Sequence, residues 1–447
     1  MRGYANEQLS FGDGFIDPEL FAFDDELKRV DHLLSERNFL APFAEVFHRS
    51  MGRPGTPVDV YLRMMYLKFR FDLSYEELQA QVRERLTWRR FCHLLLSDKV
   101  PDATTLIKLN KRFGEQRVKK LNQKLVKALM KEKSITPRRI RIDSTTLEAN
   151  VSYPTDVRLV HQVVKTLTRT AKGLGRKISN HVRATKKALA RLGASLKARG
   201  KERRTQALKT LKRVHRLAHD TVAQSRQALQ KLRTTTVAAS AQTIRHAHRQ
   251  EQFAEQINLA EQILKQTQQK LEGVTSIPER IVSFHDPAVR VIRKGKLNKP
   301  NEFGRTLDIG QDASGLIIDY EIDEGNPSDK TKVVPMVQRF KRRFHRAPDD
   351  LAGDKGFYSK TNVTTLRRLG VKRVGIAKVG RLNDREKKHQ QKKWFKELQR
   401  FRCGIEACIS MLKRQFGLGR VLSRGLSGTA IWVGFSILSY NLWQMAK

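Results

Sequence analysis

The feature of this sequence that most constrains its fold is a helical block, residues 155–273, that stands between two stretches of strand pattern. Within it, residues recur on a seam at alternating intervals of four and three: Ile178, Val182, Thr185, Leu189, Leu192 and Leu196, with Thr185 as the polar member. Two further seams run through Leu208, Leu211, Ala218, Val222, Leu229 and Leu232, and through Phe253, Ile257, Ala260, Leu264 and Leu271. The segment "ARGKERR" suits a chain reversal between the first two. Heptad spacing of this kind predicts an antiparallel helical hairpin or a three-helix coiled coil.

The segments on either side of this block predict one interrupted α/β core. Before it, the alternation of "RRIRID" indicates a strand that ends at Asp143. After residue 300, "FGRTLDIG" and "GLIIDYEI" predict a hairpin, followed by helix, short strand, helix, strand and a long helix. We therefore expect a core formed by residues 135–154 and 280–447, with residues 155–279 inserted into it.

Residues 1–134 are expected to form a helical domain. Ser74 and Glu77 have capping-box spacing, and Pro101-Asp102 precedes a segment with apolar residues at helical intervals. Helix-turn-helix geometry is one interpretation of such a domain. A scaffold bundle without base contacts is an equal alternative.

The charge balance points to a polyanionic partner. The chain has 88 Lys and Arg against 45 Asp and Glu, a formal charge of +43. Within residues 155–250 there are roughly 24 basic residues and only 3 acids. A solvated coiled-coil surface usually mixes both signs, so charge of one sign favours contact with a phosphate backbone.

The sequence gives no sign of export or of a membrane span. The N-terminus lacks an apolar signal region, and the run "AIWVGFSILSYNLWQM" is too short and too polar to cross a bilayer. Cys92, Cys403 and Cys408 fit neither a disulfide framework nor zinc-site spacing. We expect a cytoplasmic protein in which Cys403 and Cys408 are packing residues.

Two acids stand at expected strand ends, and a third stands on a helix. Asp143 ends the first strand, Asp354 follows "DDLAG", and Glu406 shares one polar stripe of the last long helix with Arg402 and Lys413. Taken singly, a turn or surface role suits each acid.

Other acids compete for the same assignment, and only the order of strands and helices singles out these three. The competing acids are Glu148, Asp286, Asp308, Asp319 and Asp350. Three converging carboxylates would repel one another unless hard cations neutralise them, and their oxygens suit Mg²⁺ or Mn²⁺. A pair of such ions supports phosphodiester cleavage and strand transfer.

The motifs resemble those of the DDE transposases of bacterial insertion sequences, whose catalytic core is ribonuclease-H-like. The matching segments are "IDSTTLEANVSYPTD", "HDPAVRVIRKGKLNKPNEFG", "EGNPSD", "GDKGFYS" and "GIEACISMLKRQFGLGR". The resemblance implies that Asp143, Asp354 and Glu406 bind the catalytic Mg²⁺, with Mn²⁺ as a substitute and two ions in all. Arg402 and Lys413 match the supporting arginine and lysine of the family.

The sequence departs from the family pattern at two places. Gln399 stands where many relatives have a tyrosine, so the resemblance does not carry over a step that needs a phenol there, such as hairpin formation on DNA. The insertion follows the first strand, whereas better known relatives carry theirs before the glutamate helix.

Further basic and aromatic residues are candidates for contact with DNA. Lys294, Lys296 and Lys299 lie between insertion and core, and Lys355 and Tyr358 lie close to Asp354. A solvated loop is an equal reading for the three lysines, and packing is the alternative for Tyr358.

The resemblance implies a transposase that binds terminal inverted repeats, cleaves the ends and joins the 3′ hydroxyls to target DNA. Its partners would be double-stranded DNA, at the element ends and at the target, and a second copy in a homodimer or higher oligomer. It would act in the bacterial cytoplasm, associated with the nucleoid when bound to DNA. The alternatives are a nuclease of the same core without strand transfer, and a non-catalytic DNA-binding protein.

Overall fold

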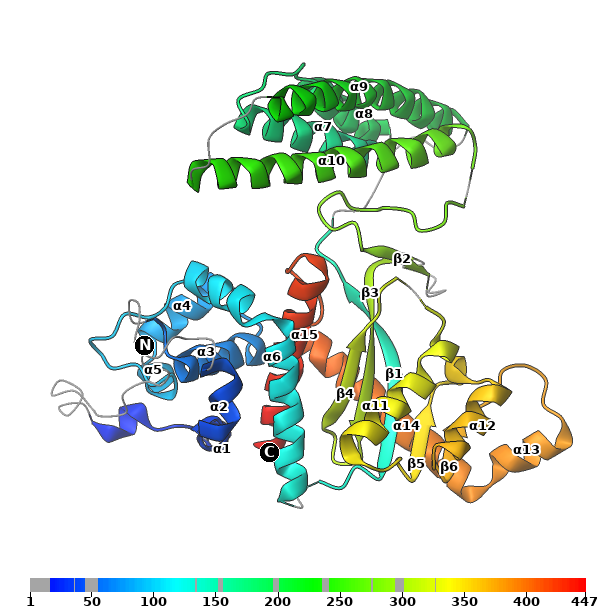
Figure 1. Cartoon of the computed structure of the whole chain (residues 1–447). Coiled ribbons are helices and arrows are strands. Elements are labelled where there is room, and N and C mark those ends of the chain that lie inside the picture. Colours follow the sequence, from blue (N-terminus) through cyan, green and yellow to red (C-terminus); the bar gives the residue numbers. More distant parts are fainter. Residues whose placement is uncertain are drawn as a thin grey trace. The chain divides into compact units, whose positions relative to one another are not determined.

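The chain folds into two compact units, each described here by itself (Figure 1). The computed structural model describes residues 17–35, 37–44, 55–132, 135–151, 156–195, 201–234, 241–274, 276–293, 301–325 and 327–447. The first unit comprises residues 1–150 and 304–447, and the second comprises residues 151–303. The protein is a mixed α/β chain with one mixed sheet.

The N-terminal part of the first unit is helical, as the sequence predicts. Its elements are η2 (Pro18–Phe21), α1 (Asp25–Ser35), α2 (Arg37–Ala44), α3 (Val58–Arg70), α4 (Tyr75–Glu84), α5 (Leu86–Phe91) and α6 (Ala103–Lys131). The predicted capping box is present, because the Ser74 side chain accepts from the Glu77 amide and Glu77 accepts from the Ser74 amide. Asp102 caps α6 by accepting from the Thr105 amide.

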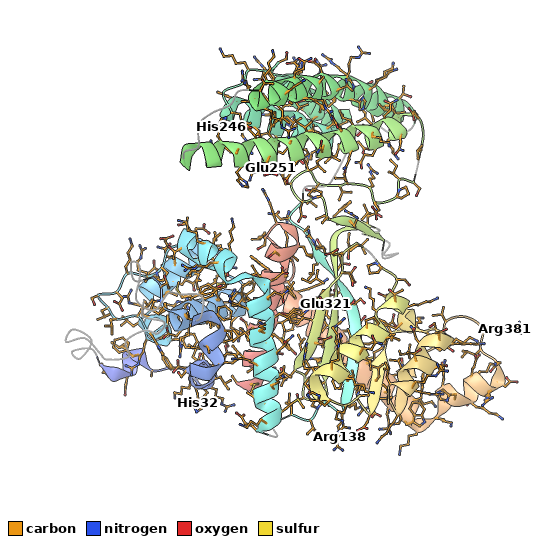
Figure 2. The ribbon with its side chains drawn as sticks, viewed as in Figure 1. His32, Arg138, His246, Glu251, Glu321 and Arg381 are labelled. Carbon is orange, nitrogen blue, oxygen red and sulfur yellow. The ribbon has the colours of Figure 1, made fainter. Side chains whose placement is uncertain are left out.

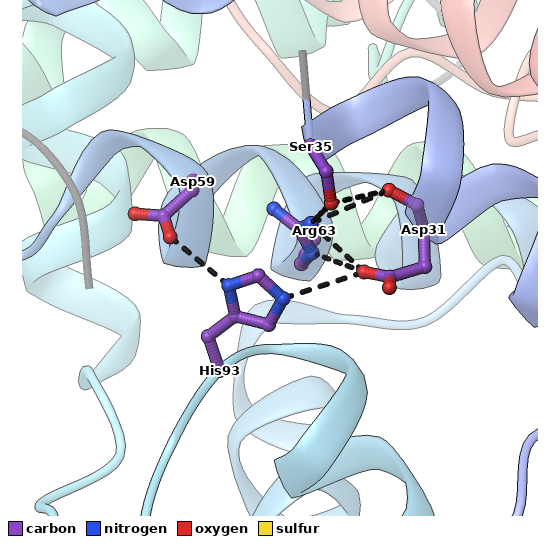
Figure 3. A network of polar contacts seen from close by, with 5 residues as sticks. All are labelled: Asp31, Ser35, Asp59, Arg63 and His93. Atoms are coloured by element: carbon purple, nitrogen blue, oxygen red, sulfur yellow. Dashed lines mark hydrogen bonds and ion pairs between the residues drawn. The ribbon is translucent and has the colours of Figure 1, made fainter. Parts of the chain in front are cut away.

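A buried polar network fixes α1, α3 and the loop after α5 to one another (Figure 3). Arg63 is fully buried, and its guanidinium donates to the Asp31 carboxylate at 2.8 Å and to the Ser35 hydroxyl at 2.9 Å. His93 lies between two carboxylates, with Nδ1 3.2 Å from Asp59 and Nε2 3.4 Å from Asp31. The guanidinium of Arg63 is buried away from water, and the Asp31 carboxylate pairs with its charge there. A buried charge needs such a partner.

The last helix, α15 (Gly425–Met445), joins these helices to the α/β part. It contains no charged residue and is buried over most of its length, because α3 and α6 pack along it and β4 and α14 also contact it. Helical region and sheet thus share one hydrophobic core. In the described part of the chain, no helix is long and apolar enough to cross a membrane.

A six-stranded mixed sheet forms the centre of the α/β part. Its strands are β1 (Arg139–Glu148), β2 (Arg290–Arg293), β3 (Asn301–Asp312), β4 (Ile317–Ile322), β5 (Asp350–Gly353) and β6 (Arg373–Ile376). The order is β2-β3-β1-β5-β6, with β4 also paired to β3. On one side β1 pairs antiparallel with β3, and on the other it pairs parallel with β5, which pairs parallel with β6. The predicted strand order after residue 300 is confirmed, whereas β2 was not foreseen.

The prediction that the first strand ends at Asp143 is wrong. β1 continues through Ser144, Thr145 and Thr146 to Glu148, still paired with β3. The threonines are β-branched and favour extended backbone, and the antiparallel partner is long enough to accompany them. What ends near Asp143 is the parallel partner β5, whose last pair with β1 is Ile142 with Gly353.

Helices follow the later strands as expected. They are α11 (Val333–Phe344), α12 (Lys360–Arg368), α13 (Asp384–Gln391) and α14 (Lys393–Gln415), with short 3-10 turns η3 (Asp329–Thr331) and η4 (Lys355–Phe357). α14 contacts β1, β5 and β6. The side of α14 that faces the sheet buries Ile405, Cys408 and Leu412, and Phe416 is buried at its C-terminal end. Cys403 is exposed, which corrects its expected packing role.

Over its described residues the second unit contains a bundle of four helices, so the predicted number of helices, two in a hairpin or three in a coiled coil, is wrong. They are α7 (Asp156–Gly173), α8 (Val182–Ser195), α9 (Lys201–Arg233) and α10 (Ala241–Leu271). The helix that the sequence reading missed, α7, buries Val160, Val163, Val164 and Leu167. α7 and α9 form a central pair, each packed against α8 and α10. The stretch from Ile178 to His181 precedes α8, so the first seam begins outside the helix.

Candidate active site

The sheet register places Asp143 and Asp354 beside each other. Ile142 pairs with Gly353 where β1 and β5 run parallel, and the aspartates are the next residues along the chain: Asp143 within β1, and Asp354 directly after β5. Because neighbouring parallel strands run in register, both aspartates lie at the same end of the sheet, the end at which β5 stops. The Asp143 carboxylate accepts from the Ser144 amide at 2.8 Å.

Glu406 is positioned by a close approach of α14 to β1. Arg141 lies under the helix, where it donates to the Phe401 carbonyl at 3.0 Å and to the Gln311 side chain at 2.8 Å. A Cβ at position 404 would stand 2.0 Å from the Arg141 guanidinium, so any larger residue than Gly404 would displace the end of the Arg141 side chain. Asp143 follows Arg141 by two residues, on the same face of the strand. Glu406 lies one helical turn beyond Arg402, which pairs with it at 3.0 Å and lies 4.0 Å from Asp354, so this side of α14 brings Glu406 towards the aspartates.

Arg402 is the cation of this group. Its guanidinium donates to Glu406 at 3.0 Å and lies 4.0 Å from the Asp354 carboxylate. The charges of Asp354 and Glu406 outweigh its partial burial and raise the pKa of Arg402 further. The predicted group of Asp143, Asp354, Glu406 and Arg402 is thus brought together from three segments distant in sequence.

Asp143 has the electrostatics of a ligand for a cation. Burial, together with the nearby carboxylates of Asp354 and Glu406, raises the pKa of Asp143 to about 6, against the opposing effect of Arg402. A carboxyl group that is costly to ionise alone is one that a bound cation would stabilise.

The donors suit a hard divalent ion in kind, since all three predicted ligands are carboxylates. Among the residues that the structure describes, however, no three acidic, histidine or cysteine side chains stand close enough together to hold a metal ion. Instead, Arg402 supplies the positive charge between Asp354 and Glu406.

A second charged cluster directly behind Asp143 was missed by the sequence reading. Lys332 is buried and its Nζ lies 3.1 Å from Asp308, 2.6 Å from Asp323 and 3.3 Å from Asp329. The Ser144 hydroxyl donates to Asp308 at 2.8 Å and also reaches Asp329 at 3.1 Å. One lysine therefore serves three carboxylates, and Ser144 ties them to the strand residue next to Asp143.

This cluster reaches the other aspartate as well. A Cβ on Gly356 would stand 3.1 Å from an oxygen of Asp329 and 3.8 Å from one of Asp354. The glycine of "GDKGFYS" thus leaves room for two carboxylates. Burial raises the pKa of Asp308 to about 6 although Lys332 opposes the rise. Asp329 is the last residue of "EGNPSD", one of the segments that resemble transposase motifs, but no role was predicted for it from the sequence.

Some of the remaining candidate residues lie in the described part of the chain, and others lie outside it. Lys413 lies seven residues beyond Glu406 on α14 and is half-buried. Lys355 is exposed in η4, and Tyr358 packs partly against the core. Lys294, Lys296 and Lys299 lie outside the described residues. Gln399 donates to the Gly375 carbonyl at 2.6 Å, so its amide binds the sheet.

Several competing acids have structural ion pairs. Asp350 accepts two hydrogen bonds from Arg373, each at 2.6 Å, and Asp319 pairs with Arg339 and Arg343 at 3.1 Å. Asp308 belongs to the Lys332 cluster. These contacts explain three of the competing carboxylates.

Two family models match the chain. Residues 18–112 match the family described as Transposase domain (DUF772), and residues 279–442 match the family described as Transposase DDE domain. A Rhizobium meliloti protein described as "Uncharacterized protein ORF8 in nfe locus" is 29% identical over 181 residues, which cover 36% of this chain and 87% of that protein. No solved structure matches the chain significantly.

Proposed function

Since the chain belongs to the DDE transposases of insertion sequences, we propose that it moves a DNA element. It binds the terminal inverted repeats, cleaves the phosphodiester bonds at the ends and joins the 3′ hydroxyls to target DNA. The observation that carries this proposal is that Asp143 and Asp354 follow paired residues of β1 and β5, while Arg402 pairs with Glu406 and lies 4.0 Å from Asp354.

We propose a ribonuclease-H-like core for the α/β part. The strand arrangement supports it, because β1 is flanked by the antiparallel β3–β4 hairpin on one side and by the parallel strands β5 and β6 on the other. In this proposal the core comprises residues 135–154 and 280–447. Residues 1–134 bind DNA ends or the second copy, and residues 155–279 are the insertion. The active form on DNA is a homodimer or larger, because two ends must be held together.

The carboxylates of Asp143, Asp354 and Glu406 would hold Mg²⁺, or Mn²⁺ as a substitute, and we propose two ions in all. Two ions held there would polarise a water or 3′ hydroxyl and would stabilise the leaving oxygen. Arg402 orients Glu406 through the hydrogen bond between their side chains. The Ser144 hydroxyl, held by Asp308 and Asp329, stiffens the strand that presents Asp143.

Replacing Asp143 by asparagine tests the catalytic assignment. Asp143→Asn should abolish Mg²⁺-dependent cleavage of DNA that carries the element ends, while binding of those ends is kept. Retained cleavage in this variant would remove Asp143 from the catalytic group.

A nuclease that cuts without joining is the rival within the same core. A strand-transfer assay with pre-cut ends separates the two, because a transposase joins such ends to a target plasmid in Mg²⁺ and a simple nuclease does not. Joined product from the wild-type chain and none from Asp143→Asn is the expected result.

A further inference from the structure

The basic charge of the four-helix unit is concentrated on two of its helices. α8 carries four cations and no acid: Arg183, Lys186, Lys187 and Arg191. The outward side of α9 carries a second group of four: Lys209, Lys212, Arg213 and Arg216. All eight side chains are exposed.

Each group forms a stripe along one side of its helix. The spacing in α8 is i, i+3, i+4 and i+8, and in α9 it is i, i+3, i+4 and i+7, so neighbours lie on one face. The opposite sides are buried, through Thr185 and Ala188 in α8 and through Leu211, Val214 and Ala218 in α9. The stripes therefore point to solvent.

The two stripes stand on adjacent helices. α8 packs against α9, and the turn before α8 is fastened there, where His181 lies 2.6 Å from Asp220 and the Ser179 amide donates to Gln224 at 2.7 Å. Asp220, the acid on this side of α9, is thereby engaged by His181 and Gln224. We call the eight cations of these two neighbouring helices the α8–α9 face. Three of them, Lys209, Lys212 and Arg216, also line a hollow that is shared with Glu272 at the end of α10.

α10 presents a different surface. Its exposed Arg249 and Lys265 share the helix with Glu251, Glu255 and Glu261 (Glu251 is labelled in Figure 2), and Arg226 of α9 pairs with Glu261. Over the described residues, by contrast, none of the eight cations of the α8–α9 face pairs with a carboxylate. The α8–α9 face thus differs from the surface of α10 in having no ion pair, and Glu272 is the acid that borders it, in the hollow lined by Lys209, Lys212 and Arg216.

Eight uncompensated cations repel one another unless an anion covers them, so the occupant is a polyanion. A stripe of four over seven residues spans about 10 Å, a length along which a DNA strand presents about three phosphates at 3.4 Å each. A second copy of this chain is a poor occupant, because it has a formal charge of +43 and the same basic face.

We infer that the α8–α9 face binds the phosphate backbone of double-stranded DNA. The inference rests on the proposed function, since it names the surface by which the insertion would hold the DNA that the core cleaves. Contact of this kind is independent of base sequence and depends steeply on salt.

The salt dependence of DNA binding by the full-length chain tests the inference. The test variant combines Arg183→Gln, Lys187→Gln, Lys212→Gln and Arg216→Gln. The matched control removes four exposed cations from α7 and α10 of the same unit: Arg169→Gln, Lys172→Gln, Arg249→Gln and Lys265→Gln. The probe is a duplex of about 30 base pairs of arbitrary sequence, titrated at several salt concentrations, with circular dichroism as the check of folding.

In the test variant, the plot of log K against log salt should be shallower by about 3, and in the control by less than about 1. Equal changes in both variants would overturn the inference, because diffuse charge would then explain binding. An unchanged slope in the test variant would overturn it too. So would loss of binding to vesicles of anionic phospholipid with DNA binding intact, because the face would then serve a membrane.

The proposed cleavage reaction can be tested independently of the α8–α9 face. Asp143→Asn should keep the wild-type salt slope, since its α8–α9 face is intact. A steep slope that depends on this face, in a wild-type chain without any metal-dependent cleavage, would contradict the proposed reaction and leave the DNA-binding face standing.

Discussion

At the scale of single residues, the partly buried Asp143 carboxylate lowers the stability of the folded chain when it is ionised. Its folded-state pKa of about 6 lies above the ordinary value of 3.8, so the folded chain binds the proton more tightly than the unfolded chain. Between about pH 4 and pH 6 this group therefore makes stability fall as pH rises, and above pH 6 the full destabilisation remains.

Asp143→Asn should accordingly raise the free energy of unfolding at pH 7 by about 1 to 3 kcal/mol. The gain should vanish near pH 4, and the stabilisation that Mn²⁺ gives the wild-type chain should be lost. Thermal unfolding with and without Mn²⁺ measures both. A variant less stable than wild type at pH 7 would contradict the account of this carboxylate.

Lys332 is the residue whose loss should cost most in the cluster behind the site. Lys332→Met leaves Asp308, Asp323 and Asp329 without their shared cation, and an uncompensated buried charge costs about 3 kcal/mol or more. Urea unfolding at pH 7 measures the loss. The matched control is Lys330→Met, because Lys330 is exposed and should change stability by less than about 0.5 kcal/mol. Equal losses in the two variants would contradict the role given to Lys332.

At the scale of elements, the site depends on how closely α14 lies on β1. Gly404→Ala would force the Arg141 guanidinium away and break its bonds to Phe401 and Gln311, at a cost of about 1 to 3 kcal/mol. Because Glu406 follows on the same helix, cleavage should fall more than stability does. Gly173→Ala on α7 is the control, since its Cβ would meet open space and alanine favours helix. Activity kept in Gly404→Ala would show that the close approach does not position Glu406.

The Arg63 network should make the N-terminal helices sensitive to pH. Although burial opposes it, hydrogen bonds to Asp31 and Asp59 raise the pKa of His93. The stability from the charged imidazole is thus fully present below about pH 6.5 and is lost as pH rises through the raised pKa. His93→Gln should cost about 1 kcal/mol near pH 6 and less near pH 9, as urea unfolding across this range would show. A loss that does not vary with pH would contradict the charged state of His93.

The sequence predicts the elements better than their contacts. Capping residues, alternation and heptads are local, so α4, α6, the order of strands after residue 300 and the stripe on α14 could all be foreseen. The continuation of β1 past Asp143 depends on its partner β3, and α7 depends on burial by three other helices. Such features follow from tertiary pairing, which no local pattern contains.

At the scale of the whole molecule, the candidate site was predictable where it depends on the order of motifs, and not where it depends on tertiary contacts. The order of motifs along the chain singled out Asp143, Asp354, Glu406 and Arg402, and the sheet register brings them together. Lys332 and Ser144 could not be assigned from sequence, because their role arises only where β1, β3 and the loop before α11 meet. The division of charge between α8–α9 and α10 was likewise hidden, since a count over residues 155–250 averages the helices.

Cleavage at the element ends tests the central claim most directly. The full-length chain is incubated with Mg²⁺ and DNA that carries the inverted repeats flanking its coding region, and new 3′ hydroxyl ends are mapped. The wild-type chain and Asp384→Asn, which alters an exposed acid of the same unit, should cut at the repeat ends only when Mg²⁺ or Mn²⁺ is present. Asp143→Asn, Asp354→Asn and Glu406→Gln should each lose at least about 100-fold in rate while still binding the ends. Cutting by any of these three at the wild-type rate, or cutting that needs no divalent metal, would contradict the account.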